Sequence, residues 1–194
     1  TATPTDTATP TDTAAPSDTT APSDTTAPDT FDKAAAFPKI SCDDVDGECV
    51  EIMPGDSEAL LETVNLLSDD TTVVLAKGMW NLTNQVTLRD ASGTRLVGQG
   101  IDVTVLSFKD SEVQTNGVDV IGDAFVIEDL TIEDAKKDAL RIEDSKGVTI
   151  RRVKVTWPAG PQPENGAYGI YPVRCHDVLM EECEAYHASD AGLY

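Results

Sequence analysis

The chain has 194 residues, of which 40% are hydrophobic and 5% aromatic, enough apolar material to bury one sizeable core. It carries 35 acidic residues against 14 basic ones, which gives a formal net charge of −21. This charge repels phosphate backbones and anionic membrane surfaces, so it argues against nucleic acid as a partner. No apolar run approaches the ~20 residues that a membrane-spanning helix needs.

Residues 1–36 are predicted to form a disordered stalk rich in Thr, Pro and Asp. Prolines at positions 4, 10, 16, 22 and 28 and aspartates at 6, 12, 18 and 24 both recur every six residues. Such a segment has no apolar face to bury, and proline favours extended geometry. Tracts of this composition carry O-linked sugars and hold domains away from surfaces, so the alternatives are a stalk and a passive tail. Both favour an extracytoplasmic location, which is secreted, periplasmic or anchored at the cell surface.

Residues 37–69 are predicted to contain a disulfide hairpin followed by a capping helix. Six residues separate Cys42 from Cys49, a spacing that closes a small loop in an exported chain and stabilises it by about 2–3 kcal/mol. The acidic loop between them leaves Ca²⁺ binding open as an alternative. However, it lacks the Asp-x-Asp-x-Asp-Gly order and the distal Glu of an EF-hand, so a plain turn is preferred.

An amphipathic helix is predicted from Ser57 to Ser68, capped by Asp56 or by Ser57 itself. It places four apolar side chains on one face, namely Leu60, Leu61, Val64 and Leu67. The strands predicted to follow would present a bare sheet edge, which promotes aggregation. We therefore predict that this helix caps the first coil of a solenoid.

Residues 70–194 are predicted to form a parallel β-helix, because short apolar segments recur along them. Equivalent segments begin at Val118, Leu140, Ile170 and Leu193, which are 22, 30 and 23 residues apart. Their residues alternate at period two, are rich in Val and Ile, and lack the 3.6-residue stripe of a helix. Stacked ~4.8 Å apart, such coils bury their inward residues as ladders and pair each strand with its neighbours. Earlier coils are predicted around residues 73–75, 86–88, 94–96 and 105–108.

The same alternation assigns side chains to the two faces of the coil. The outward positions next to the ladder are Asp119, Arg141, Tyr171 and Tyr194. Cys183 takes the inward position that Val153 has one coil earlier. Cys175 and Cys183 are therefore interpreted as small buried residues, with a disulfide as the alternative.

Several runs resemble a known protein family. They are Gly78-Met-Trp-Asn-Leu, Val97-Gly-Gln-Gly, Gly147-Val-Thr-Ile-Arg-Arg-Val, Asn165-Gly-Ala-Tyr-Gly-Ile-Tyr and Ser189-Asp-Ala-Gly-Leu-Tyr. On these runs, roughly residues 50–194 resemble bacterial right-handed parallel β-helix repeat proteins of the pectin-lyase-like superfamily. The resemblance implies a right-handed coil, and a groove beside the first strand of each coil that holds an extended polysaccharide. The fold hosts lyases, hydrolases, epimerases and non-catalytic adhesins, so activity has to be argued from a site.

One coil is 30 residues long where its neighbours have 22 or 23, and the extra residues fall in the loop 157–166. Three prolines stiffen this loop, which is predicted to form one wall of the groove. Aromatic faces stack on sugar rings, and Arg pairs with uronate carboxylates. The predicted substrate-binding residues are Tyr168, Tyr171, Arg174, Asp119, Asp138 and Trp157.

The predicted catalytic residues are His187, Asp190 and Arg141. Proton abstraction next to a uronate carboxylate, by lysis or epimerisation, needs a cation that neutralises this carboxylate and a positioned base. Arg141 and Arg174 are candidates for the cation, and His187 and Lys136 are candidates for the base.

A structural alternative stays open for each of these residues. In it, His187 caps a turn, the tyrosines pack at strand edges, and Arg141 pairs with an acid such as Asp119. Three Ile-Glu-Asp triplets begin at positions 127, 132 and 142 and place acids at outward or turn positions. They favour a solvated surface over a calcium ladder, and no metal ligand set is predicted; Ca²⁺ is the one cofactor left open.

The sequence therefore predicts an all-β protein, a right-handed parallel β-helix with a short N-terminal capping helix. It is predicted to be truncated at the C-terminus, because it ends within a strand pattern at Tyr194. The predicted function is recognition of an extended polysaccharide, with lyase-, epimerase- or hydrolase-like processing as an extension. The alternative is a non-catalytic structural or adhesive surface scaffold.

Overall fold

The structure is a computed structural model that describes residues 31–89 and 92–194. The chain divides into two units, Thr1–Phe31 and Asp32–Tyr194. Most of the predicted stalk lies outside the described residues, but its last residues belong to the second unit. There, α1 (Lys33–Ala36) begins with the Asp32 side chain accepting a hydrogen bond from the Ala35 N–H. The folded unit thus begins a few residues before the predicted boundary, because Ala36 is buried.

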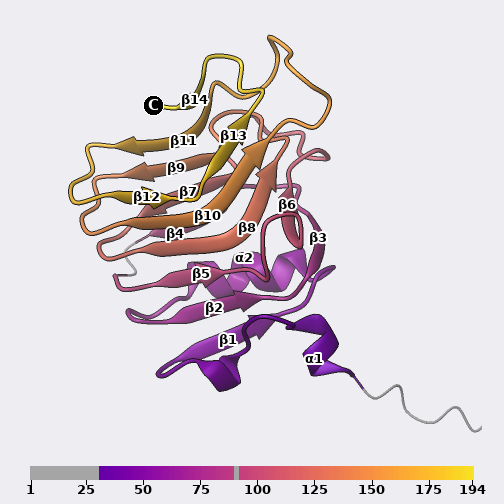
Figure 1. The fold of residues 1–194 in the computed structure, drawn as a ribbon, viewed down its shortest axis with the longest axis vertical. Helices are drawn as coiled ribbons and strands as arrows, with labels where there is room; N and C mark the ends of the chain where they lie inside the picture. The colour runs from indigo at the N-terminus through magenta and orange to yellow at the C-terminus, as the bar shows by residue number, and fades with distance from the viewer. Residues whose placement is uncertain (1–30, 90–91) are drawn as a thin grey trace, which may run out of the picture. The chain divides into compact units, whose positions relative to one another are not determined.

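The second unit is a parallel β-solenoid of about six turns, in which all strand pairs are parallel (Figure 1). Sheet A follows the order β1 (Cys49–Ile52), β2 (Thr72–Leu75), β5 (Arg95–Val97), β8 (Val126–Glu133), β10 (Thr149–Thr156), β12 (Leu179–Glu181). Its second arm consists of β3 (Gly78–Asn81), β6 (Thr104–Ser107), the later halves of β8 and β10, and β13 (Glu184–Tyr186). Sheet B follows the order β4 (Val86–Arg89), β7 (Val118–Ile121), β9 (Leu140–Glu143), β11 (Tyr168–Val173), β14 (Ala191–Leu193).

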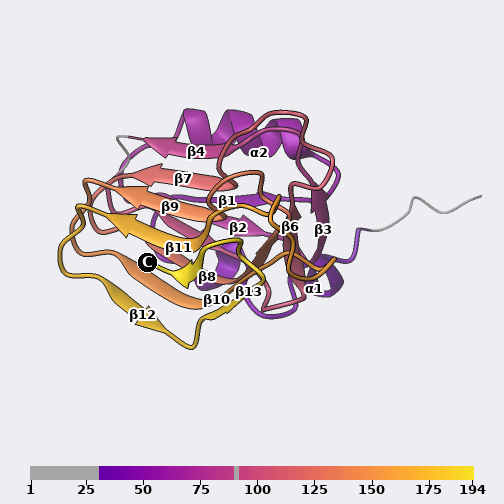
Figure 2. The ribbon, with the colours of Figure 1, turned by 90° about the horizontal axis from the view of Figure 1, so that it is seen from above.

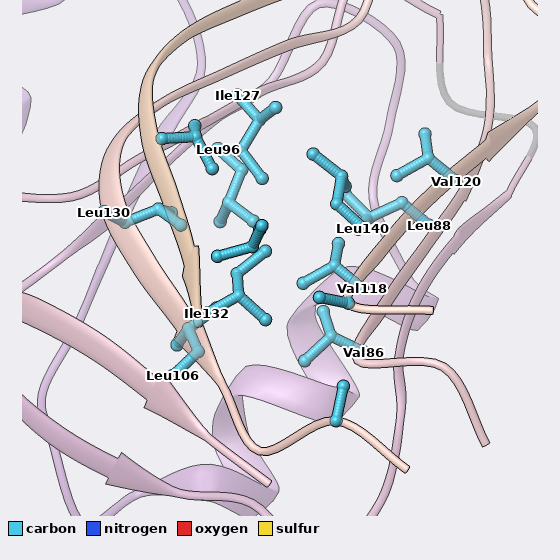
Figure 3. Close-up of a cluster of buried hydrophobic side chains, with 14 of the residues drawn as sticks. Val86, Leu88, Leu96, Leu106, Val118, Val120, Ile127, Leu130, Ile132 and Leu140 are labelled. Carbon is cyan, nitrogen blue, oxygen red and sulfur yellow. The ribbon is translucent and has the colours of Figure 1, made fainter. Parts of the chain in front are cut away.

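The predicted inward ladder is confirmed. Val118 pairs with Leu140, Leu140 with Ile170, and Ile170 with Leu193, and the ladder also includes Val86. Figure 3 shows Val86, Val118 and Leu140 of sheet B pointing toward the side chains of sheet A across the inside of the coil. Leu193 is 52% exposed because it lies on the last coil, whereas the other four are fully buried.

Long strands of sheet A bend at residues in the left-handed conformation. Asp129 in β8 has φ 60° and Arg152 in β10 has φ 49°, so inward side chains occur on both sides of each bend. Asp134 and Asp144 also have positive φ, of 56° and 48°. Each Ile-Glu-Asp triplet thus ends on a left-handed corner residue, a conformation that Asp tolerates better than most residues.

The predicted cap is confirmed as α2 (Ser57–Asn65). The Asp56 side chain accepts a hydrogen bond from the Ala59 N–H at 3.2 Å, and Leu60 and Val64 are buried. The helix lies beside β4 on the side away from β7, where it covers the edge of sheet B (Figure 2). It ends three residues earlier than predicted, and Leu66 is 83% exposed.

The predicted Cys42–Cys49 disulfide is present, next to the short helix Cys42–Asp44 and at the start of β1. The segment before β1 covers outward side chains of sheet A, because Phe37 packs with Val74 and Val97. The Gln99 side chain holds this segment by hydrogen bonds to the backbone of residues 39 and 40. Because β1 pairs with β2, the solenoid begins before residue 70, where the sequence predicted its start.

Cys175 and Cys183 carry free thiols that are partly buried against the core. Their Sγ atoms lie 3.3 Å and 3.5 Å from the carbonyl oxygens of Ile142 and Ile150 in the preceding coil. The interpretation as small core residues is confirmed, and the alternative disulfide between them does not form.

We expect Leu140→Ala to lower the free energy of unfolding by about 2–5 kcal/mol, because it opens a cavity in the middle of the ladder. Leu193→Ala is the matched control on the same ladder, and it should change stability by less than about 1 kcal/mol because Leu193 is half exposed. Urea unfolding followed by circular dichroism measures both. Equal effects would contradict the ladder.

Candidate functional site

The outer face of sheet B brings together most of the residues predicted from the sequence. Strand register places Asp119 beside Arg141 and Arg141 beside Tyr171. Asp138 lies in the turn before β9, and Tyr168 is the first residue of β11; each precedes its neighbour in this row, Arg141 or Tyr171, by three residues. We define the sheet B surface as the outward side chains Asn116, Asp119, Asp138, Arg141, Tyr168, Tyr171 and Tyr194 on β7, β9, β11, β14 and their turns.

Three tyrosines form a cluster at one end of this surface. The ring centroids of Tyr168 and Tyr171 are 4.6 Å apart, those of Tyr168 and Tyr194 are 4.9 Å apart, and those of Tyr171 and Tyr194 are 5.4 Å apart. The guanidinium carbon of Arg141 lies 5.1 Å from the centroid of the Tyr171 ring. A hydrogen bond to Asp190 raises the pKa of the Tyr168 hydroxyl. The cluster is thus held by ring packing, a cation–π contact and one carboxylate.

A hollow of about 430 Å³ adjoins the cluster, and we call it the sheet B hollow. Its lining is rich in amide and hydroxyl groups: Gln85, Gln114, Thr115, Asn116, Lys137, Asp138, Arg141, Glu143 and Ala167. A smaller hollow of about 270 Å³ next to α2 shares Gln85 and Thr115 with it. Together with the tyrosines, these hollows follow sheet B from β4 to β14, which is four strand spacings or about 19 Å.

The arginines of this region are paired with carboxylates. Arg141 donates to Asp138 at 2.9 Å and also to Glu143. The hydrogen bond from Arg141 holds the pKa of Glu143 below its usual range. Arg174 donates to Asp144 at 2.6 Å and 2.7 Å and to Glu143 at 3.3 Å. These two guanidinium groups therefore already have anionic partners.

The structural alternative, in which Arg141 pairs with an acid, is confirmed, but the acids are Asp138 and Glu143 and not Asp119, which was named as the example. Asp119 is buried and instead accepts hydrogen bonds from Arg89 and from the Asn116 amide, the latter at 3.0 Å. The reason is geometric, since Asp138 and Glu143 lie on the same coil as Arg141 and on the same side of the sheet. A uronate carboxylate bound here would have to compete with Asp138 and Glu143.

Trp157 and His187 lie at the base of the long loop. Trp157 is only 3% exposed, and its indole N–H donates to the Ala135 carbonyl at 2.9 Å, so its ring belongs to the core rather than to an open stacking surface. His187 has φ 64°, and its Nδ1 lies 3.0 Å from the Trp157 carbonyl oxygen. Its own carbonyl accepts a hydrogen bond from Asn165 at 2.7 Å. These contacts match the turn-capping alternative for His187.

The other candidate base, Lys136, donates to the Lys109 carbonyl at 2.9 Å. Within residues 31–89 and 92–194, no group of three or more His, Cys, Asp or Glu side chains is arranged to hold a metal ion. No helix in the described part of the chain has the length and apolar character needed to cross a membrane.

Sequence reasoning missed a cluster of charges on the outer face of sheet A. Glu128 and Asp129 are each only 3% exposed, so the solvated surface expected for the first Ile-Glu-Asp triplet is wrong. Glu128 accepts hydrogen bonds from Arg95 at 2.7 Å and Arg152 at 3.0 Å. Asp129 accepts hydrogen bonds from Arg152 at 2.7 Å and 2.8 Å and also pairs with Lys39 of the N-terminal segment.

A periodic signal for part of this cluster was present in the sequence. Glu128 and Arg151 are 23 residues apart, the length of one coil, and strand register does place them side by side. No such signal exists for Lys39, because it lies outside the repeats. The cluster joins neighbouring coils to the N-terminal segment, and we interpret it as structural.

Comparison with known proteins gives no further assignment, because no family model, no curated protein and no solved structure matches the chain.

The buried cluster predicts a dependence of stability on pH. Burial raises the pKa of Asp129, but hydrogen bonds from Arg152 and Lys39 outweigh burial and lower the pKa below its usual value. Stability from this group is therefore present above the unfolded pKa of about 3.9 and is lost as the pH falls through the lower folded pKa. Asp129→Asn, which tolerates the same positive φ, should destabilise the protein by roughly 1–3 kcal/mol at neutral pH.

Urea unfolding at a series of pH values measures this difference, which should shrink below about pH 4. Asp144→Asn is the control, since Asp144 has the same backbone conformation but forms an exposed pair with Arg174 and should have a smaller effect. A difference for Asp129→Asn that stayed constant down to strongly acidic pH would contradict this assignment.

Proposed function

We propose that the sheet B surface binds an extended, uncharged polysaccharide, and that the chain is an extracytoplasmic recognition protein. The observation that carries this proposal is the cluster of Tyr168, Tyr171 and Tyr194 at the end of a long polar hollow. The resemblance of the chain to β-helix proteins of the pectin-lyase-like superfamily supports the same ligand class, and membership in that superfamily is part of the proposal.

The tyrosines provide the apolar contact that a sugar ring needs. Aromatic rings pack against the C–H faces of sugars while the phenol hydroxyls remain available for hydrogen bonds. Tyr194 is largely exposed, and Tyr168 and Tyr171 are partly exposed, so their rings are accessible at this end of the surface. A chain of sugars that stacks here would continue into the adjoining sheet B hollow.

The hollow provides polar groups that match sugar hydroxyls. Amide side chains such as Gln85, Gln114 and Asn116 both donate and accept hydrogen bonds, as does the hydroxyl of Thr115. The polar region and the tyrosines together extend about 19 Å along the direction of coil stacking. This length suits an oligosaccharide of several units rather than a single small ligand.

The pairing of charges favours an uncharged ligand over a uronate polymer. Arg89, Arg141 and Arg174 each have a carboxylate partner, so an anionic sugar would have to displace an ion pair to bind any of these three arginines. Among the described residues that line the hollow, only Lys137 offers a cation outside such a pair. The formal net charge of −21 also repels a polyanion at long range. Because the Arg141 guanidinium is already paired with Asp138 and Glu143, we propose binding as the role of this surface. Catalysis by Arg141 with His187 or Asp190 stays a prediction.

The Cys42–Cys49 disulfide supports the extracytoplasmic part of the proposal, because disulfides persist mainly in oxidising compartments. The experiment is a glycan array of neutral and acidic polysaccharides, probed with and without Ca²⁺, together with ultraviolet detection of unsaturated uronate products. We expect binding to a neutral polymer without product. Product formation would indicate a lyase, and no binding to any glycan would overturn the proposal in favour of the scaffold alternative.

Tyr171→Ala should weaken binding of the selected glycan roughly tenfold, which corresponds to about 1.4 kcal/mol, because it removes one of the three rings of the cluster. Tyr171→Phe retains the ring and should keep most of the affinity. Tyr186→Ala is the control, since Tyr186 is 46% exposed but lies on β13 of sheet A. Isothermal titration calorimetry measures the three variants, and equal losses for Tyr171→Ala and Tyr186→Ala would argue against the sheet B surface.

A further inference from the structure

A separate hollow of about 440 Å³ lies beneath the long loop, and we call it the Trp157 hollow. Its lining comes from three successive coils: Lys109, Asp134, Ala135, Lys136, Trp157, Pro158, Ala159, Glu164 and Asn165. Lys136 and Asn165 face this hollow, whereas Lys137 and Ala167 line the sheet B hollow. The chain at residues 136–137 and 165–167 thus separates the two hollows.

The walls of the Trp157 hollow combine an apolar part with charges of both signs. Pro158 and Ala159 form the exposed apolar part, above the buried side chains of Ala135 and Trp157. Two carboxylates and two ammonium groups complete the lining, so the local charge sums to zero. Because the two signs balance, the lining offers no net electrostatic attraction to either a cation or an anion.

Asp134 and Glu164 are the two carboxylates of this lining, and Asp134 is the more buried of them. Burial raises the pKa of its carboxyl group, while the charges of Lys136 and Lys109 act in the opposite direction. Among the described residues, its carboxylate has these two lysine charges nearby but no hydrogen-bond donor within bonding distance. A partly buried acceptor without a donor favours a ligand that brings hydroxyl groups.

We propose that the Trp157 hollow binds one neutral sugar unit, such as a branch or an end of a glycan. Sugar hydroxyls donate to Asp134 and Glu164 and accept from Lys109 and Lys136, and the C–H face of the ring packs on the apolar part. The hollow is a compact site for a single ring, unlike the elongated sheet B surface. The inference takes its ligand class, a sugar, from the proposed function, but it concerns a separate site.

The indole N–H of Trp157 is a local reporter of binding, because Trp157 lines the hollow whereas the chain's other tryptophan, Trp80, does not. The full chain, labelled with ¹⁵N, is titrated with glucose, galactose, mannose and N-acetylglucosamine, and separately with acetate and inorganic phosphate. The indole N–H signals are followed in ¹H–¹⁵N correlation NMR spectra. We expect at least one neutral sugar to shift the Trp157 signal and leave the Trp80 signal in place. If no sugar shifts it, or if acetate or phosphate shifts it instead, the inference is overturned.

Substitutions at Asp134 test its role without straining the backbone, since glycine and asparagine both tolerate its φ of 56°. Asp134→Gly should weaken the affinity for the sugar, measured from the Trp157 signal, roughly tenfold, and Asp134→Asn should weaken it by a smaller factor. Asp177→Gly is the matched control, because Asp177 has φ 54° but lies in the exposed turn before β12. If Asp134→Gly fails to fold, Asp134→Asn carries the test, and an unchanged affinity in the folded variant overturns the inference.

The two proposals fail independently. Tyr171→Ala should leave the Trp157 titration unchanged, and Asp134→Gly should leave stacking of a linear glycan on the sheet B surface unchanged. A Trp157 response without glycan binding at sheet B would overturn the proposed function alone, whereas the reverse pattern would overturn this inference alone.

Discussion

The structure depends on one constraint, the parallel register between successive coils. The strands of a coil find their hydrogen-bond partners in the coils above and below, so each inward position must be repeated by the next coil. The ladder from Val86 through Leu140 to Leu193 is the direct result. An insertion is tolerated only where it leaves this register unchanged. The loop 157–166 meets that condition, since Leu140 still pairs with Ile170 across it.

The same register determines which charges become neighbours. Side chains on adjacent strands lie about 4.8 Å apart, so a row of like charges would be unfavourable. The chain instead places Arg141 next to Asp119 and Glu128 next to Arg151. Most of its few basic residues form ion pairs with carboxylates, although the protein as a whole is strongly acidic. Coil stacking therefore pairs opposite charges across neighbouring strands, and this pairing is one reason why we propose an uncharged ligand for the sheet B surface.

Sequence periodicity was sufficient for the features that repeat with the coil. The ladder, the outward row of sheet B and the capping helix follow from alternation and spacing, and the Cys42–Cys49 disulfide follows from a local spacing. Features that depend on side-chain reach or on non-repeating segments were not predictable. Arg141 donates hydrogen bonds to Asp138 and Glu143 of its own coil, and Asp129 accepts one from Lys39, which lies ninety residues earlier in the sequence. Trp157 seemed a surface residue from its place in a loop, but its ring turns into the core.

The two outer faces of the coil have different surroundings, and this difference locates the candidate site. On sheet A, the N-terminal segment covers the first strands, and the ion pairs around Glu128 and Asp129 join the next coils, so its outward groups are largely occupied. On sheet B, α2 covers only the edge at β4, and the described residues leave the tyrosines and the polar hollow accessible. Both sheets keep the same register through their inward residues. The outward residues on the accessible face of sheet B can therefore vary without changing the core. The proposed binding groups therefore lie on sheet B and under the loop beside it, where the fold places the least demand on residue type.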